Sequence, residues 1–275
     1  MNEPIRVDID GMLAEAASRF GGTFIGTVKY GWNKKSAGCL LRRGRREVWL
    51  KVQFADPNHF NERSWNGEIL SANIEGICKP RVLEYTDWET AGVLWRALLM
   101  DAIEERLCSP TQEISSDLQL PQDWYNSLRS SLVNLAVVKT DRISCRQDLI
   151  NRRIAERFGT SLNVEVDEWI TCHGDLHWAN LTCPRLFILD WEGWGLGPKG
   201  LDPALLLGVS GLAPTVGLQI RRTFSDWLGT RSGLIALLFV AAELLRMIDL
   251  YGDYPALQKP LEQLGSDALD ALRCL

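Results

Sequence analysis

The sequence predicts an α+β protein in two parts, an antiparallel five-stranded sheet with one main helix followed by a mostly helical part. Three observations predict this fold class. Strand-forming residues recur in short segments between residues 23 and 100. One helical pattern, over residues 61–75, interrupts them. From about residue 104 the spacing of apolar residues changes from two to 3.6, the period of a helix. We therefore place a boundary between residues 1–103 and 104–275.

The N-terminal part is expected to begin with a short amphipathic helix over residues 8–20, which ends at two glycines. Five strands are predicted, at residues 23–30, 37–42, 47–54, 81–85 and 91–100. The loop between the first two strands contains two lysines and a serine. The polar residues 86–90 are assigned to the turn between the last two strands.

Helical patterns dominate the C-terminal part. Helices are predicted at residues 122–138, 142–158, 215–228, 232–251 and 255–274. A short strand is expected at residues 168–172. Residues 191–200 contain four glycines, and we expect them to be irregular and flexible.

Length and composition are those of a globular protein. The chain has 275 residues, 46% hydrophobic and 24% charged, which is enough for a large core or two lobes. The formal net charge of −5 argues against nucleic-acid binding, which favours basic surfaces. The seven cysteines are scattered and odd in number, which favours reduced thiols in the cytoplasm. The longest apolar run, residues 234–242, is far too short to span a membrane, and we expect no membrane partner.

The most informative stretch carries the pattern His173-x-Asp175-x4-Asn180 and ends at Asp190. Phosphoryl transfer needs a carboxylate that accepts the proton of the attacking hydroxyl, and it needs hard oxygen ligands for magnesium. The residues between Asn180 and Asp190 contain a Pro-Arg turn flanked by short segments, and they are predicted to form a tight antiparallel hairpin. Such a hairpin would return Asp190 beside Asn180, where both could bind metal ions.

The pattern HGDLHWAN followed by ILDWE resembles the signature of the aminoglycoside phosphotransferase and choline kinase family, small-molecule relatives of the protein kinases. The resemblance implies a bilobal protein-kinase-like fold. It also implies ATP and Mg²⁺ as cofactors, Asp175 as the catalytic base, and Asn180 and Asp190 as magnesium ligands. The ten-residue spacing from Asn180 to Asp190 is short for this family and implies a clipped hairpin. The resemblance further implies that Asp202 supports the catalytic loop, although by its position before a proline it could simply be a helix N-cap.

The same resemblance assigns nucleotide-binding roles in the N-terminal part, which is expected to end in a hinge. Lys51, in the third strand, would hold the α and β phosphates, and Glu68 would be its ion-pair partner. Glu68 is preferred over two other acids, at positions 62 and 75, because it lies in the middle of the helix. Ser36 is a candidate phosphate contact. Met100 and Ala102, in the hinge segment 99–103, are candidates for binding adenine.

Two other functions compete with the kinase hypothesis. His173 and His177 flank Asp175, and with Asp190 they could hold zinc or iron in a metallohydrolase. That interpretation leaves Lys51 and the other nucleotide-binding residues unexplained. A pseudokinase that binds nucleotide without transferring phosphate is the second alternative. Pseudokinases typically lose the base, the lysine or the metal acid, and all are present in this chain.

The expected activity is ATP- and Mg²⁺-dependent phosphorylation of a hydroxyl on a small molecule. The acceptor is expected to be an aminoglycoside or another antibiotic or sugar, which would imply antibiotic resistance, and a choline-like compound or amino alcohol is the alternative. Trp178, Trp191 and Trp194 could stack on such a substrate or belong to the core. Six acids near the C-terminus could bind a cationic sugar: Glu243, Asp249, Asp253, Glu262, Asp267 and Asp270.

Overall fold

The computed structural model of the chain describes residues 8–31, 34–55, 60–159 and 164–275. The chain divides into two compact units. The first consists of Met1–Ala72 and Pro80–Glu104, and the second of Asn73–Lys79 and Glu105–Leu275.

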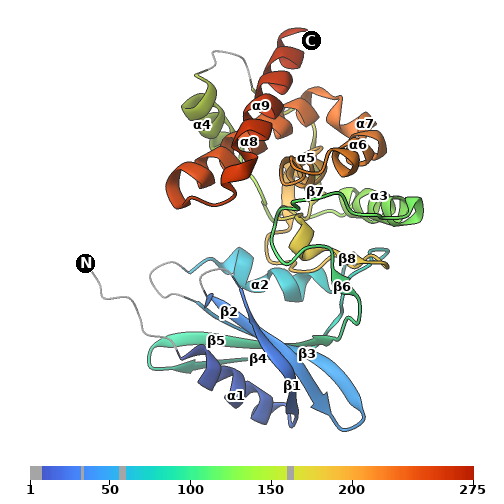
Figure 1. Cartoon of the computed structure of the whole chain (residues 1–275). Coiled ribbons are helices and arrows are strands. Elements are labelled where there is room, and N and C mark those ends of the chain that lie inside the picture. The colour runs from blue at the N-terminus through green and yellow to red at the C-terminus, as the bar shows by residue number, and fades with distance from the viewer. Residues whose placement is uncertain (1–7, 32–33, 56–59, 160–163) are drawn as a thin grey trace. The chain divides into compact units, whose positions relative to one another are not determined.

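The first unit is a five-stranded antiparallel sheet with the strand order β1-β2-β3-β5-β4. Its strands are β1 (Thr23–Tyr30), β2 (Ser36–Arg43), β3 (Arg46–Ala55), β4 (Val82–Thr90) and β5 (Val93–Asp101). Two helices, α1 (Ile9–Arg19) and α2 (Glu62–Ser71), lie on opposite faces of the sheet (Figure 1). The fold class predicted for the N-terminal part is confirmed.

The two faces of the sheet differ in polarity because side chains alternate along a strand. Val48, Leu50 and Val52 of β3 point to one face and are buried in a cluster with Leu13 of α1. The residues between them point to the other face, toward α2, and Lys51 is one of these. The alternation of side chains along β3 therefore places Lys51 on the face of the sheet that α2 covers.

The hairpin between β4 and β5 corrects one prediction. Residues 86–90, which we assigned to a turn, continue β4, and the turn consists of Ala91 and Gly92. Both turn residues have positive φ, 51° and 75°, as the tightest two-residue hairpins require. The polar side chains of β4 have partners within the sheet: the Asp87 carboxylate accepts two hydrogen bonds of 2.6 Å from Arg96 in β5. A polar segment is therefore a regular edge strand.

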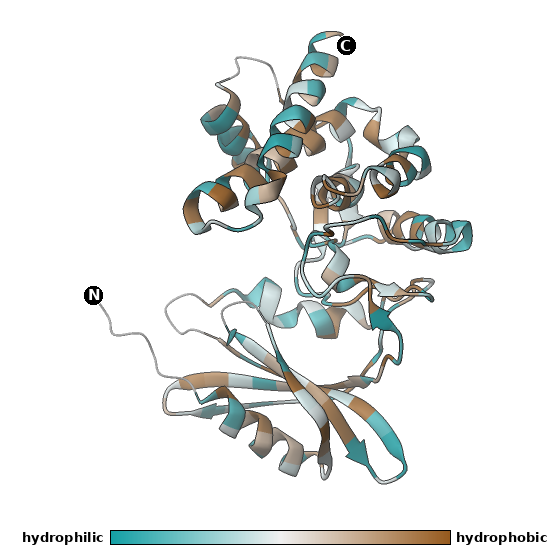
Figure 2. Cartoon of the chain, viewed as in Figure 1, coloured by the Kyte–Doolittle hydropathy of each residue, from teal (hydrophilic) through white to brown (hydrophobic). Residues whose placement is uncertain are grey.

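The second unit is mostly helical, which confirms the predicted class of the C-terminal part. Its helices are α3 (Gln122–Ala136), α4 (Gln147–Phe158), α5 (Leu201–Gly208), α6 (Pro214–Thr223), α7 (Ser225–Leu228), α8 (Arg231–Tyr251) and α9 (Gln258–Arg273). Figure 2 shows α5 and α8 as predominantly hydrophobic, and both contribute many residues to the buried core. None of the helices in the part of the chain that the structure describes has the length and hydrophobicity needed to cross a membrane.

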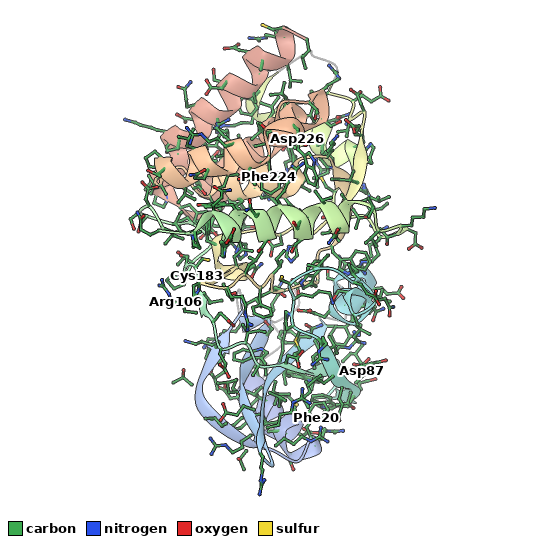
Figure 3. The ribbon with its side chains drawn as sticks, turned by 90° about the vertical axis from the view of Figure 1, so that its right-hand side faces the viewer. Phe20, Asp87, Arg106, Cys183, Phe224 and Asp226 are labelled. Carbon is green, nitrogen blue, oxygen red and sulfur yellow. The ribbon has the colours of Figure 1, made fainter. Side chains whose placement is uncertain are left out.

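Short strands and single helical turns complete the second unit. They are β6 (Arg106–Leu107), β7 (Trp169–Cys172), β8 (Thr182–Cys183), β9 (Gly195–Pro198), and the 3₁₀ turns η2 (Trp178–Asn180) and η3 (Pro255–Leu257). Strand β6 pairs antiparallel with β8, so that Arg106 lies opposite Cys183 (Figure 3). Strand β7 pairs antiparallel with β9. These pairs frame the segment that contains Asp175 and Asn180.

The glycine-rich segment 191–200 corrects a second prediction, because part of it is the regular strand β9. Its glycines allow close packing. A Cβ atom at Gly195 would lie 2.8 Å from backbone atoms of Arg142 and Ser144, and one at Gly197 would lie 2.7 Å from the Cys172 sulfur. The helix predicted from residue 142 begins only at Gln147, because the residues before it pack against β9.

Candidate active site

Lys51 and Glu68 form an ion pair within the first unit. The Lys51 Nζ atom lies 3.2 Å from Glu68 Oε1, and the two side chains are only 12% and 3% exposed. The two competing acids lie elsewhere: Glu62 is exposed at the start of α2, and Glu75 lies outside this helix. The structure therefore brings together the two residues that the sequence analysis paired.

We expect Glu68→Gln to lower the free energy of unfolding by about 3 kcal/mol, because removing one partner of a buried ion pair leaves the other charge uncompensated. The double variant Lys51→Met/Glu68→Gln should recover at least half of this loss. Urea unfolding of the single and double variants measures both effects. Equal destabilisation in the single and double variants would contradict a buried, coupled pair.

The other nucleotide-binding candidates occupy the ends of strands. Ser36 is the first residue of β2, and its carbonyl oxygen accepts a 2.9 Å hydrogen bond from the Gly31 amide. Met100 is buried in β5 opposite Trp49 of β3, and Ala102 follows directly after the strand ends. No observation on Ser36, Met100 or Ala102 tests nucleotide binding, and their roles stay predictions.

Asp202 supports the loop that precedes Asp175. Its two carboxylate oxygens accept backbone hydrogen bonds, each 2.8 Å, from His173 and Gly174. The side chain is fully enclosed, and burial raises the pKa of Asp202, although the charge of His173 and these two hydrogen bonds oppose the shift. The residue before α5 is Gly200 rather than Asp202. Asp202 therefore does not act as the helix N-cap, and it supports the loop as the resemblance implies.

Asp175, His177 and Asn180 form a compact cluster. The Asn180 Nδ2 atom donates to the Asp175 backbone oxygen at 3.0 Å and lies 3.3 Å from Asp175 Oδ2. The His177 Nε2 atom lies 3.2 Å from Asn180 Nδ2 and 3.5 Å from Asp175 Oδ2. These contacts use the amide nitrogen of Asn180, and its amide oxygen, an acceptor, can serve as a metal ligand.

The predicted hairpin returns the chain to Asn180. Leu181 pairs with Ile188 in an antiparallel bridge, and the Leu189 amide donates a 2.8 Å hydrogen bond to the Asn180 carbonyl oxygen. His173 is fully buried, and its Nε2 atom lies 3.0 Å from the Leu189 carbonyl oxygen. Asp190 follows Leu189 and has a positive φ of 61°. The contacts on both sides of Leu189 thus fix where the chain reaches Asp190.

The surroundings of Asp175 favour the ionised form of its carboxylate. Its side chain is 47% exposed, and partial withdrawal from water raises its pKa, but a hydrogen bond from His177 and the positive charges of His177 and His173 lower it by more. The Asn180 amide adds to the lowering. The net result is a pKa below the usual value of an aspartate. A carboxylate that is ionised at neutral pH can accept a proton, as a general base must.

His177→Gln is expected to move the acidic limb of the pH–rate profile to higher pH. With Asp175 as the expected base, the rate should fall as pH drops through the pKa of Asp175. Replacing His177 removes the two largest influences that lower the pKa of Asp175, so that pKa rises. The measurement is kcat/KM for phosphate transfer against pH. An unchanged acidic limb would mean that another group controls it.

The oxygen atoms of Asn180 and Asp190 suit magnesium. Mg²⁺ prefers oxygen ligands and is commonly bound by one or two carboxylates together with substrate phosphates and water. Within the described ranges, no three His, Cys, Asp or Glu side chains converge in an arrangement that could hold a metal ion. A zinc or iron site of His173, His177 and two carboxylates is therefore not supported, and the donor set fits a metal that also binds phosphate oxygens.

The three tryptophans near the motif belong to the core. Trp178 and Trp191 are fully buried, and Trp194 is 5% exposed. Trp178 stacks on Trp124 with ring centroids 5.9 Å apart, and its indole nitrogen donates a 2.9 Å hydrogen bond to Ser210. The possibility that they stack on a substrate is not supported.

Four of the six acids near the C-terminus are already paired with arginines. Glu243 contacts Arg153 and Arg246, and Arg157 pairs with both Asp249 and Glu262. Asp270 pairs with the neighbouring Arg273. These ion pairs leave little of the acidic excess for a cationic substrate.

The sequence analysis missed two residues near Asp175, Glu113 and Tyr254. Burial, together with the negative charges of Asp253, Glu113 and Asp175, raises the pKa of Tyr254 to about 12. The Glu113 Oε2 atom is buried, with no hydrogen-bond partner among the described residues. Tyr254 has a positive φ of 52°, which is uncommon for a tyrosine. Neither residue belongs to a motif, so only the folded chain reveals that they lie near Asp175.

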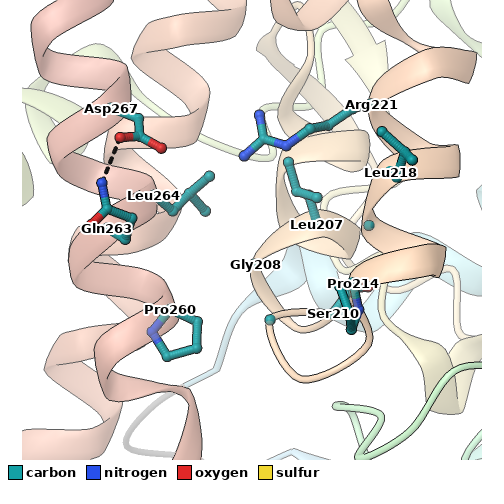
Figure 4. A pocket seen from close by; sticks show the side chains of 12 residues that line it. Leu207, Gly208, Ser210, Pro214, Leu218, Arg221, Pro260, Gln263, Leu264 and Asp267 are labelled. Carbon is teal, nitrogen blue, oxygen red and sulfur yellow. Dashed lines mark hydrogen bonds between the residues drawn. The ribbon is translucent and has the colours of Figure 1, made fainter.

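The second unit also has an open groove of about 460 Å³ between α5, α6 and α9. Leucine and proline side chains line it, and Arg221 and Asp267 extend from opposite sides (Figure 4). Ser210, which accepts the hydrogen bond from Trp178, lies in its lining.

Searches of protein-family models and of curated proteins find no match to this sequence. Solved structures do match. A spectinomycin phosphotransferase in complex with ADP and spectinomycin is 12% identical, with a TM-score of 0.57, over 97% of this chain and 94% of that one. A microcompartment-associated aminopropanol kinase is 14% identical, with a TM-score of 0.58, over 95% and 97%. An aminoglycoside phosphotransferase in complex with ADP and hygromycin B is 11% identical, with a TM-score of 0.59, over 97% and 98%.

The chain has the fold of the protein-kinase-like small-molecule kinases. The predicted resemblance is thus confirmed at the level of the fold. In a kinase-like fold of this kind, the Lys51–Glu68 pair and the cluster around Asp175 are the candidate catalytic parts, one in each unit.

Proposed function

We propose that the protein is an ATP- and Mg²⁺-dependent O-phosphotransferase that phosphorylates a hydroxyl group of a small molecule bearing an amino group. The observation that carries the proposal is the cluster in which Asn180 contacts the Asp175 carboxylate at 3.3 Å and anchors the backbone next to Asp190 at 2.8 Å. It combines a candidate base with two candidate magnesium ligands. We place the enzyme in the cytoplasm, because its seven cysteines are free thiols.

In the proposed reaction, Asp175 accepts the proton of the acceptor hydroxyl while the hydroxyl oxygen forms a bond to the γ-phosphorus. The bond between that phosphorus and the β–γ bridging oxygen breaks, and ADP leaves with the electron pair. Magnesium held by Asn180 and Asp190 would offset negative charge on the phosphates. Lys51, kept in place by Glu68, would bind the α and β phosphates. Positioning and charge stabilisation would supply most of the rate enhancement.

The amino group of the acceptor is inferred from the charges near Asp175. The Trp178 amide donates a 3.1 Å hydrogen bond to the Gln112 carbonyl oxygen, so Glu113 lies beside the loop that contains Asp175. The negative charges of Glu113, Asp253 and Asp175 all raise the pKa of Tyr254. The buried Glu113 Oε2 atom lacks a hydrogen-bond donor among the described residues. An ammonium group on the acceptor would supply that donor and a compensating charge. Kinases of similar fold act on or bind aminopropanol and aminoglycosides, which carry amino groups beside hydroxyls.

The test is ADP release, measured by a coupled assay with ATP and Mg²⁺, in the presence of paired acceptors. Aminopropanol, ethanolamine, spectinomycin and hygromycin B are the cationic compounds, and propanediol and glucose are the neutral ones. We expect acceptor-dependent ADP release with at least one cationic compound. Glu113→Gln should raise KM for that compound about tenfold and change kcat little, because it removes binding rather than chemistry.

Two results would overturn parts of the proposal. A preference for neutral acceptors, or an unchanged KM in Glu113→Gln, would remove the amino-group requirement and leave the kinase assignment in place. ATP binding without transfer to any acceptor would favour the nucleotide-binding pseudokinase. Glu165→Gln is a suitable control, because Glu165 lies outside the Asp175 cluster.

A further inference from the structure

The segment Thr140–Cys145, which precedes α4, packs along the chain that follows Asp190. The Leu196 amide donates a 2.8 Å hydrogen bond to the Arg142 carbonyl oxygen, and the Ser144 and Cys145 amides donate to the Leu196 carbonyl oxygen at 2.9 and 3.1 Å. Ile143 also pairs with Leu196 in a parallel bridge. The segment therefore adds backbone pairing to β9 on the side away from β7.

Arg142 binds the same stretch through its side chain. It is only 7% exposed, its Nε atom donates a 2.9 Å hydrogen bond to the Trp194 carbonyl oxygen, and its Nη2 atom donates a 3.0 Å bond to the Glu192 carbonyl oxygen. The guanidinium group also lies 4.7 Å from the centroid of the Trp194 ring. A planar guanidinium with several fixed donors can bind two carbonyl oxygens at once, whereas a lysine ammonium is a single point charge.

The segment also touches the loop that carries Asp175. A Cβ atom at Gly174 would lie 1.9 Å from Ser144 Oγ and 2.9 Å from the Gly193 carbonyl oxygen. Gly174 has a φ of 81°, in the left-handed region that glycine tolerates. Gly174, Ser144 and Gly193 therefore meet with no space between them. One segment thus contacts both the catalytic loop and the chain after Asp190.

Asp190 itself is held from two sides. Before it, the Leu189 amide donates a hydrogen bond to the Asn180 carbonyl oxygen, and the Leu189 carbonyl oxygen lies within hydrogen-bond distance of His173 Nε2. After it, Arg142 binds the carbonyl oxygens two and four residues further along. The positive φ of Asp190 is a conformation that most residues avoid, so it persists only where the neighbouring chain is fixed.

We propose that Arg142 is a positioning residue that fixes the chain after Asp190 and so holds the magnesium-binding carboxylate in place before metal or nucleotide binds. The inference rests on the proposed function, because it assigns Asp190 to magnesium. It implies that the metal site is preformed, and it gives a role to a buried arginine that lies outside the motif of residues 173–190. Arg142 would act through the carbonyl oxygens and the Trp194 ring that it contacts, and not through the substrate.

The experiment measures ADP binding by calorimetry as a function of Mg²⁺ concentration, for the wild type and for Arg142→Lys. The lysine keeps the charge and the apolar stem but cannot bind both carbonyl oxygens. We expect the Mg²⁺ concentration that gives half of the maximal gain in ADP affinity to rise about tenfold, the low end of the effect of removing a group that orients a metal ligand. ADP affinity without Mg²⁺ should stay unchanged. Arg142→Gln should give a larger rise in the same direction.

Arg146→Lys is the matched control. Arg146 lies four residues away, is 63% exposed and pairs with Asp148, so ADP binding by Arg146→Lys should depend on Mg²⁺ as it does in the wild type.

If Arg142→Gln does not fold, Arg142→Lys alone decides the question. If ADP binding by Arg142→Lys depends on Mg²⁺ concentration in the same way as in the wild type, only the positioning role of Arg142 is overturned. A wild type whose ADP binding does not depend on Mg²⁺ overturns the proposed function and the inference together. A loss of ADP affinity in Arg142→Lys that is equal with and without Mg²⁺ indicates a general structural role and also overturns the inference.

Discussion

Asp175→Asn is expected to lower kcat for phosphate transfer about a thousandfold, within the range attributed to a general base. Asparagine has nearly the same shape as aspartate, so the contact with Asn180 can persist, but an amide cannot accept the hydroxyl proton. ADP affinity should change less than about threefold, because the base acts on the acceptor rather than on the nucleotide. Steady-state ADP release and ADP calorimetry on the same preparation measure the two quantities.

Asp148→Asn is the control for this variant. Asp148 also has a pKa below the usual value, in its case because of a hydrogen bond from Arg146, but it lies on the exposed first turn of α4. We expect its kcat to match that of the wild type. If Asp175→Asn kept more than about a tenth of the activity, Asp175 would not be the base and the proposed mechanism would be wrong.

The parts of the fold that follow local patterns could be predicted from the sequence. The first strand occupies Thr23–Tyr30 as expected, and α4 ends at Gly159, whose φ of 55° is the left-handed conformation expected of a glycine at the end of a helix. Lys51 was predicted in the third strand, with Glu68 preferred as its partner because that acid lies in the middle of the helix, and the two side chains form an ion pair at 3.2 Å. Such features depend on residues that are close in sequence, so their signals survive in a single chain.

The errors arose where a tertiary partner overrides local composition. Residues 86–90 look like a turn because they are polar, but Asp87 is stabilised in a strand by Arg96 in the neighbouring strand. The glycines of residues 191–200 suggested flexibility, yet they are the residues that let Arg142 and Ser144 approach β9 closely. Glycine content alone does not distinguish a mobile loop from a tightly packed strand.

The candidate site likewise contains residues that local sequence patterns predict and residues that only tertiary packing brings together. Asp175, Asn180 and Asp190 could be found because the motif is nearly continuous, and the hairpin that joins the last two was predicted from its turn. Glu113 and Tyr254 are separated from the motif by more than fifty residues in either direction. Their proximity to Asp175 depends on packing across the helical unit, for which a single sequence carries no local signal.

Asp190→Asn is expected to lower kcat/KM about a thousandfold at a magnesium concentration that saturates the wild type. A bound metal ion supplies several kcal/mol of charge stabilisation in the transition state, and each 1.36 kcal/mol corresponds to a factor of about ten. The amide keeps one oxygen but loses the negative charge that attracts Mg²⁺. Raising the Mg²⁺ concentration should therefore restore part of the activity, whereas it should not restore Asp175→Asn.

The backbone at Asp190 makes asparagine the informative substitution. With a φ of 61°, the residue lies in the left-handed region, which asparagine tolerates well and alanine avoids at a cost of about 1 kcal/mol. Asp190→Asn therefore removes charge without added strain, and Asp190→Ala removes both the ligand and the backbone preference. We expect equal activity losses at low Mg²⁺, but a lower melting temperature only in the alanine variant. If Asp190→Asn showed wild-type Mg²⁺ dependence, the metal would be held by other groups, and the left-handed backbone at Asp190 would then serve only the fold.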